Sequence, residues 1–296
     1  MKTLIRAARQ ATLAATCTLA VSLWLLPAWA GDPFRSRNPR PIGDRTEAAF
    51  NAIFQEGNYP AASQHLDVAL RDDANEPLVY AMRASLAYNQ ERWDDLNRYA
   101  QQTIATAERL QASDALRGNL YLAVGKFMEG AYVFKTRGPV GAAVKLQEVL
   151  RHLNAARDLD PNDPELNLLR GYMELLLAVN VPFASPEQAI ANFEANAAPA
   201  YLVHRGIAIA YRDLKRYDEA LTYANRALAA TPNNPEVMYL KAQILHEKGK
   251  QVGDRATVQE SITLFDRALA ASAQLPPSLP RQINRERDIA QAWLNG

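Results

Sequence analysis

The sequence predicts an all-α protein built from repeated helix pairs, and three observations support this prediction. From residue 43 onward, small and apolar residues recur at intervals of three and four, the spacing of one face of an α-helix. No sustained alternation of β-branched and polar residues predicts a strand. A pattern of alanines and prolines recurs along the chain, which is typical of proteins made of structural repeats.

Residues 1–30 have the pattern of a secretory signal peptide. The first ten residues carry three basic side chains, residues 11–30 carry no charge, and Ala28-Trp29-Ala30 offers the small residues that a signal peptidase accepts. We expect cleavage after Ala30 and export to a periplasm or, in a cyanobacterium, a thylakoid lumen. The alternative is an uncleaved membrane anchor formed by residues 11–30, because twenty uncharged residues nearly span a bilayer. The single cysteine, Cys17, lies in this segment, so the exported part would have no disulfide.

Residues 31–42 form a linker rich in proline and arginine. Three prolines between residues 32 and 41 exclude a helix there. Arg35, Arg37, Arg40 and Arg45 make the segment locally basic. The simpler interpretation is a solvated linker, and the alternative is an arm that docks on an acidic surface.

Two segments show the repeat most clearly. Ala156 precedes Pro161 by five residues, as Ala227 precedes Pro232, and each of these prolines begins the motif P-N-x-P-E. The small alanine allows two helices to approach closely. The first proline ends a helix, and the second suits the start of the next one, where its missing N–H costs nothing.

Residues 201–234 resemble a tetratricopeptide repeat, a 34-residue unit that folds as helix–turn–helix. His204 departs from the tryptophan that the family often has at the fourth position. The family's small, aromatic and proline positions are occupied by Ala208, Tyr211, Ala220, Ala227 and Pro232. The resemblance implies a right-handed α-α superhelix, or TPR solenoid, of about six helix pairs.

The same register extends along the chain. Tyr59, Trp93 and Tyr217 each follow a polar turn and are expected to begin the second helix of a repeat, and Tyr59 and Trp93 are 34 residues apart. The array is therefore expected to cover residues 43–275. Its repeats are placed at 43–76, 77–110, 111–163, 164–200, 201–234 and 235–275. Residues 276–296 are expected to form a linker and a capping helix, which closes the last open core of a solenoid.

Two of the repeats depart from the standard length. The third is longest, with an apolar stripe from Leu116 to Phe134 on one helix that Gly138 and Pro139 end. The sixth has a polar insertion, residues 249–254, which we expect between its two helices.

No sequence motif points to catalysis. The chain lacks the short patterns of nucleophilic hydrolases, phosphate loops, zinc proteases and calcium loops. Its four histidines are spread over separate repeats, which disfavours a metal site. The balance of 33 basic and 32 acidic residues disfavours nucleic-acid binding. We therefore expect no enzyme activity, no cofactor and no metal.

The resemblance places a binding groove on the concave face, which the first helix of each repeat lines in this family. Arg205 and Arg212 would share one helix face and could bind a carboxylate or an acidic peptide. Carried over by position, the groove residues are Arg205, Arg212, Tyr239, Gln243, His246, Tyr172, Tyr88 and Asn89. The alternative is a concave face that is only solvated. The family's carboxylate clamp for chaperone tails is not reproduced, since Ala81 occupies one of its positions.

The expected function is that of a protein- or peptide-binding scaffold or assembly adaptor outside the cytoplasm, whose partner is protein or peptide and acidic. A membrane is expected as a partner only if the signal stays uncleaved. The alternatives are an accessory subunit of an envelope or cell-wall enzyme complex, or a self-associating structural solenoid.

Overall fold

The computed structural model describes residues 31–180 and 185–296, and within these ranges every regular element is a helix. The helices are α2 (Asp44–Phe54), α3 (Tyr59–Asp72), α4 (Pro77–Asn89), α5 (Trp93–Leu110), α6 (Ala115–Arg137), α7 (Pro139–Leu159), α8 (Pro164–Asn180), α9 (Pro186–Glu194), α10 (Ala200–Asp213), α11 (Tyr217–Ala230), α12 (Pro235–Val252), α13 (Arg255–Ala270), the short 3₁₀ helix η1 (Ser272–Gln274) and α14 (Leu279–Asn295). The predicted signal peptide and membrane anchor lie outside the described residues. None of the described helices has the length and apolar character needed to cross a membrane.

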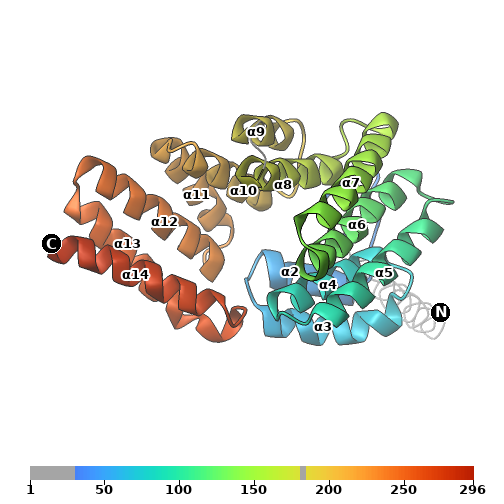
Figure 1. The fold of residues 1–296 in the computed structure, drawn as a ribbon, viewed down its shortest axis with the longest axis horizontal. Helices are drawn as coiled ribbons and strands as arrows, with labels where there is room; N and C mark the ends of the chain where they lie inside the picture. Colours follow the sequence, from blue (N-terminus) through green and yellow to red (C-terminus); the bar gives the residue numbers. More distant parts are fainter. Residues whose placement is uncertain (1–30, 181–184) are drawn as a thin grey trace, which may run out of the picture.

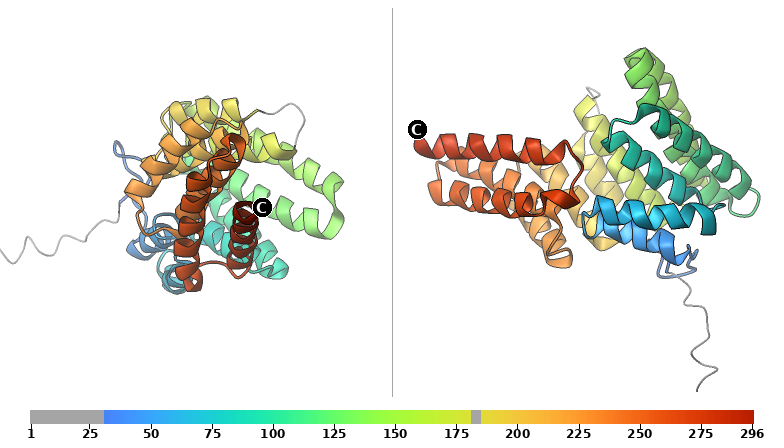
Figure 2. Two further views of the ribbon diagram at one scale, coloured as in Figure 1. Left: turned by 90° about the vertical axis from the view of Figure 1, so that its left-hand side faces the viewer. Right: turned by 90° about the horizontal axis from the view of Figure 1, so that it is seen from below.

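Consecutive helices form antiparallel pairs that stack into a curved array (Figures 1 and 2). Each of the six pairs, from α2–α3 to α12–α13, corresponds to one of the intervals marked by the sequence, except that α10 begins one residue early, at Ala200, and α14 packs on α13 at the end. This arrangement is an all-α superhelical repeat fold, as the sequence predicts.

Capping side chains and small residues explain why the pairs form where they do. Tyr59, Trp93 and Tyr217 begin α3, α5 and α11. The side chain of Asn58 accepts a hydrogen bond from the first turn of α3 and so satisfies a backbone N–H that the helix leaves free. Small side chains let the helices of a pair approach closely. Ala208, Ala220, Ala224 and Ala227 are fully buried between them.

The two long repeats differ in how they use their extra residues. In the third pair, α6 and α7 are both extended and meet at Gly138, whose φ of 77° suits a residue without a side chain. In the sixth pair, α12 continues to Val252 and ends at Gly253, so most of the polar insertion lengthens a helix. The expectation of a loop there was wrong, because the turn comes only at Gly253, in a left-handed conformation.

The N-terminal arm, residues 31–42, folds back onto the array. Phe34 packs edge-on against Phe50 with ring centroids 5.2 Å apart. Arg35 is only 7% exposed, whereas Arg37 and Arg45 are exposed. Arg35 is therefore not solvated but lies against acidic residues of the protein itself, whereas Arg37 and Arg45 face solvent.

Arg35 is the centre of a buried polar cluster, which we call the base network. Its Nε donates to Asp163 Oδ2 at 2.8 Å, and its Nη2 donates to Glu165 Oε2 at 2.8 Å. Tyr121 on α6 donates to the other oxygen of Glu165 at 2.6 Å, and Arg117 pairs with Glu76 at 2.8 Å. Burial would lower the pKa of Arg35, but its two carboxylate partners raise it above its usual value. The network therefore joins the arm, α6 and the start of α8.

The two ends of the array also touch, at what we call the closure contact. Tyr59 donates to Glu236 Oε1 at 2.9 Å, across 177 residues of sequence. The side-chain amide of Asn234 donates to the carbonyls of Phe54 and Gln55, at 3.3 Å each. Gly57 is required between them, because a Cβ there would lie 2.9 Å from Asn234 Oδ1. The first helix pair thus meets the start of α12.

Candidate functional site

The first arginine predicted to line the groove, Arg205, belongs to the closure contact. Its Nη1 donates to Glu236 Oε2 at 3.0 Å, while the other oxygen of Glu236 accepts from Tyr59. Burial alone would lower the pKa of Arg205, but Glu236 raises it above its usual value. Arg205 therefore already has a carboxylate partner within the protein.

Arg212, Tyr239 and Gln243 come together as predicted, but they share a fourth partner from α14. Arg212 Nη1 donates to Gln243 Oε1 at 2.9 Å, and Gln243 Nε2 donates to Glu286 Oε2 at 2.8 Å. Tyr239 donates to the other oxygen of Glu286 at 2.5 Å. Burial and Glu286 raise the pKa of Tyr239. The carboxylate that this part of the groove was expected to bind is thus supplied by the chain's own last helix.

The remaining predicted groove residues lie apart from one another. His246 is 6% exposed, and burial lowers its pKa. Tyr172 donates to the carbonyl of Leu202 at 2.8 Å, and burial raises its pKa to about 12. Tyr88 is 48% exposed with its ring edge-on to Trp93, and its neighbour Asn89 is partly exposed. That these residues contact a ligand stays a prediction.

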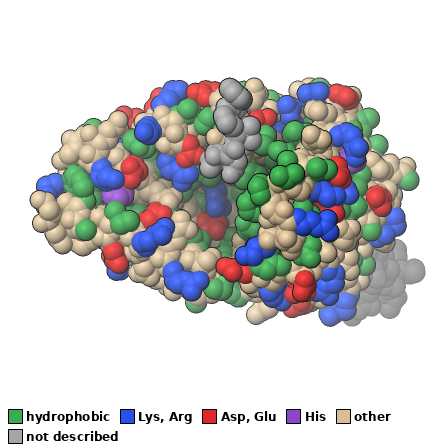
Figure 3. Space-filling view, viewed as in Figure 1, with side chains coloured by type: hydrophobic (Ala, Val, Ile, Leu, Met, Phe, Trp, Pro, Cys, Tyr) green, Lys and Arg blue, Asp and Glu red, His purple; other side chains and the backbone are tan. Residues whose placement is uncertain are grey.

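An apolar concavity lies elsewhere, between α6, α7 and α8 (Figure 3). We call it the seam hollow. Its volume is about 360 Å³. It is lined by Ala123, Val124, Phe127, Met128, Val149, Leu153, Leu169, Tyr172, Met173 and Leu176. Of these, only Tyr172 was predicted to line a binding surface.

The seam hollow exists because α6 and α8 are joined near their N-termini and make little other contact. Tyr121 and Glu165 join the two helices in the base network. Further along, α6 has no packing against α8 comparable to that of α4 on α6 or α8 on α10. A feature of the sequence could have indicated this: the apolar stripe on α6 runs to Phe134, beyond the length of an ordinary repeat.

On the opposite face of the α6–α7 hairpin, two lysines and two glutamates form ion pairs between the helices. Lys126 and Lys145 each pair with Glu129 and Glu148, at distances of 3.1 to 3.4 Å. Burial would raise the pKa of Glu148, but its two lysine partners lower it below its usual value. The hairpin is therefore held together independently of α8, and its apolar face toward α8 stays open.

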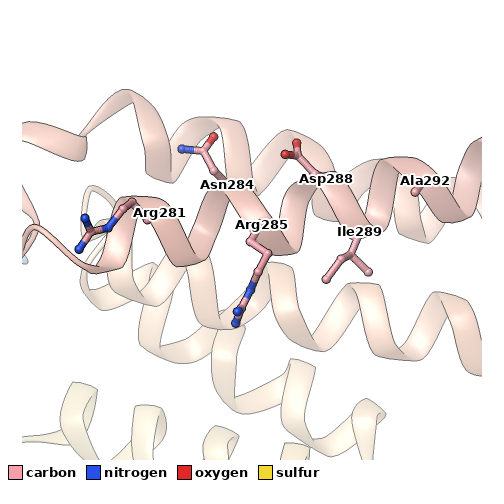
Figure 4. A pocket seen from close by; sticks show the side chains of 6 residues that line it. All are labelled: Arg281, Asn284, Arg285, Asp288, Ile289 and Ala292. Atoms are coloured by element: carbon pink, nitrogen blue, oxygen red, sulfur yellow. The ribbon is translucent and has the colours of Figure 1, made fainter.

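A second, shallow depression lies on α14, where four of the six lining side chains are polar or charged (Figure 4). Arg281 and Arg285 are exposed there, and the described residues offer them no ion pair or hydrogen bond. Ile289 is the one large apolar side chain of this face. All the lining residues come from α14 alone, so no second element encloses a ligand.

Within residues 31–180 and 185–296, no group of three or more histidine, aspartate or glutamate side chains is arranged to hold a metal ion. His152 contacts Asn119 at 3.0 Å, and burial lowers the pKa values of His152, His204 and His246. These histidines are used in packing and hydrogen bonding.

Part of the chain matches a known repeat family. Residues 203–244, which cover α10, α11 and the first half of α12, match the family model of the tetratricopeptide repeat. The chain is similar to a thermophilic TPR protein of Thermus thermophilus, with 18% identity and a TM-score of 0.47 over 68% of this chain and 97% of that one. It is also similar to a tetratricopeptide repeat protein of Parabacteroides merdae, with 15% identity and a TM-score of 0.37 over 82% of this chain and 97% of that one. None of the curated proteins matches the sequence.

Proposed function

We propose that this chain, whose residues 203–244 match the tetratricopeptide repeat family, is a non-catalytic scaffold that binds a segment of another protein in the seam hollow. Proteins with this repeat generally bind proteins or peptides and have no catalytic role. The observation that carries the proposal is the seam hollow itself, a concavity of about 360 Å³ whose lining side chains are apolar apart from the hydroxyl of Tyr172. Binding sites are typically concave and mostly apolar.

The lining of the seam hollow suits a protein partner. Met128 and Met173 contribute flexible, polarizable side chains, which adapt to partners of different shape. The arginines of the predicted groove are less suited, because Arg205 and Arg212 already bond Glu236 and Gln243. A partner that displaced these bonds would have to replace each of them.

Photo-crosslinking in the producing cell tests the proposal. A p-benzoylphenylalanine at position 173 lies in the seam hollow, and the same residue at position 259 lies on the exposed face of α13. We expect protein adducts at position 173 that are absent at position 259. Equal adducts at the two positions would refute the proposal, and an adduct with twice the mass of the chain would instead support the self-associating solenoid.

We also propose that the protein acts outside the cytoplasm after cleavage following Ala30. The support is the composition of residues 1–30, together with one contact of the next residue. Gly31 N lies 3.1 Å from Glu47 Oε2, so a free α-ammonium group at Gly31 would form an ion pair with Glu47. Mass spectrometry of the protein from its native cells should find a first residue of Gly31, whereas an intact Met1 would make residues 11–30 a membrane anchor.

A further inference from the structure

The apolar surface of the seam hollow continues along α6 beyond the hollow. Val124, Phe127 and Phe134 are spaced by three and seven residues and so lie on one helix face. Val124 and Phe127 line the hollow, and Phe134 is 59% exposed near the end of the hairpin. At a rise of 1.5 Å per residue, this strip is about 15 Å long. A strip of this length suits a chain segment better than a compact small molecule.

The wall on α8 has the same character. Leu169, Met173 and Leu176 are spaced by four and three residues and line the hollow from one face of that helix. The two walls are joined at the base network, where Tyr121 bonds Glu165, and α6 and α8 make little further contact. The groove therefore lies between two apolar helix faces that are joined through polar groups.

Next to this apolar wall in the sequence of α8 stands a cation. Arg170 follows Leu169, which lines the hollow, and is partly buried, and the described residues give it no hydrogen bond or ion pair. Burial and the charge of Arg157 lower its pKa, against the opposing charge of Glu174. The buried arginines of the base network, Arg35 and Arg117, each have a carboxylate within 2.8 Å. A partly buried arginine without such a partner favours an anion supplied from outside.

From this combination we infer that the groove between α6 and α8 takes a protein segment in which bulky apolar side chains stand next to a carboxylate. The apolar side chains enter the seam hollow, and an aspartate or glutamate of the same segment binds Arg170. The inference rests on the proposed function, that the hollow holds a protein segment, and adds the chemistry of that segment.

Selection from a phage-displayed library of random dodecapeptides on the full protein tests this inference. We expect the selected peptides to combine Leu, Ile, Phe or Met with Asp or Glu. The substitution Arg170→Glu should reduce the affinity for a selected peptide by about ten-fold or more, the effect of losing a charge-assisted hydrogen bond. Selection on that variant should yield Lys or Arg in place of the acidic residue.

Arg285→Glu on α14 is the matched control, because Arg285 also lacks a partner among the described residues but lies away from the groove (Figure 4). Its affinity for the peptide should stay within two-fold of the wild type, and circular dichroism should show unchanged helix content in both variants. Peptides that lose binding on Met173→Gln but not on Arg170→Glu would overturn the inference and leave the proposed function standing. If no selected peptide loses affinity on Met173→Gln, both the inference and the proposed function are wrong.

Discussion

The two ends of the seam between α6 and α8 are built in opposite ways. At the base, buried ions and a tyrosine hydroxyl hold the helices together, with Glu165 accepting from both Arg35 and Tyr121. At the open end, the walls of the hollow are apolar, with Phe127 on one helix and Met173 on the other. From this contrast we expect the polar residues to hold the two repeats in place and so to leave the apolar surface beyond them exposed.

The largest expected effect is at the base. Arg35→Ala would remove the nearest cation from the buried carboxylates of Asp163 and Glu165 and leave them only the longer ion pairs with Arg40 and Arg117, which should lower the free energy of unfolding by about 3–5 kcal/mol. Urea titration followed by circular dichroism measures the change. Arg37→Ala, on the exposed side of the same arm, should change it by less than about 0.5 kcal/mol. If Arg35→Ala lowers the free energy of unfolding by less than about 1 kcal/mol, the base network does not hold α6 and α8 together.

A smaller effect is expected at the closure contact, which holds the array at its other junction. Asn234 caps α12 through Glu236 N and Val237 N as well as bonding the first helix pair. Asn234→Ala should therefore cost about 1–2 kcal/mol, and the radius of gyration by X-ray scattering should increase. The adjacent Asn233→Ala is the control, because Asn233 is exposed. An unchanged radius would show that the base network alone sets the curvature.

Replacing the arginines of the predicted groove should lower the free energy of unfolding slightly and leave the affinity for a peptide in the seam hollow unchanged. Arg205→Ala removes a partly exposed ion pair with Glu236, which should cost about 1 kcal/mol. The double variant with Arg212→Ala should still bind a peptide selected on the seam hollow within two-fold, as measured by fluorescence anisotropy. Loss of binding would return the site to the groove between α10 and α12.

The smallest effect on stability is expected at the open end. Met173→Phe adds volume to the seam hollow, and because the hollow is already open, the free energy of unfolding should change by less than about 1 kcal/mol. The same substitution should reduce peptide binding, since it occupies part of the space. If Met173→Phe lowers the free energy of unfolding by about 2 kcal/mol or more, the hollow has no free space for a larger side chain, which contradicts an open apolar end.

Local features of the fold could be predicted from the sequence because they depend on neighbouring residues. Alanine positions such as Ala208 and Ala227 and the prolines that begin α4 and α12 act within one helix pair, so their pattern predicts the pair directly. The fate of Arg35 could not be predicted, because its partners lie 128 and 130 residues away and depend on how the array curves.

The candidate site was harder to predict for the same reason. The pattern grouped Arg212, Tyr239 and Gln243 correctly, but it could not show that Glu286 would fill the space between them. The seam hollow depends on how little α6 packs against α8. The spacing of residues within one helix cannot show that a contact between two helices is missing. Only the unusual length of the apolar stripe on α6 pointed toward it.

The closure contact has a consequence for how the chain unfolds. An open repeat array behaves as a one-dimensional stack, in which terminal units fray first and independently. Here Tyr59 and Asn234 tie the first unit to the sixth across 177 and 180 residues, so fraying at the N-terminal end also disturbs a unit near the other end. The array therefore gains the cooperativity of a globular domain while keeping the modular construction of a repeat protein.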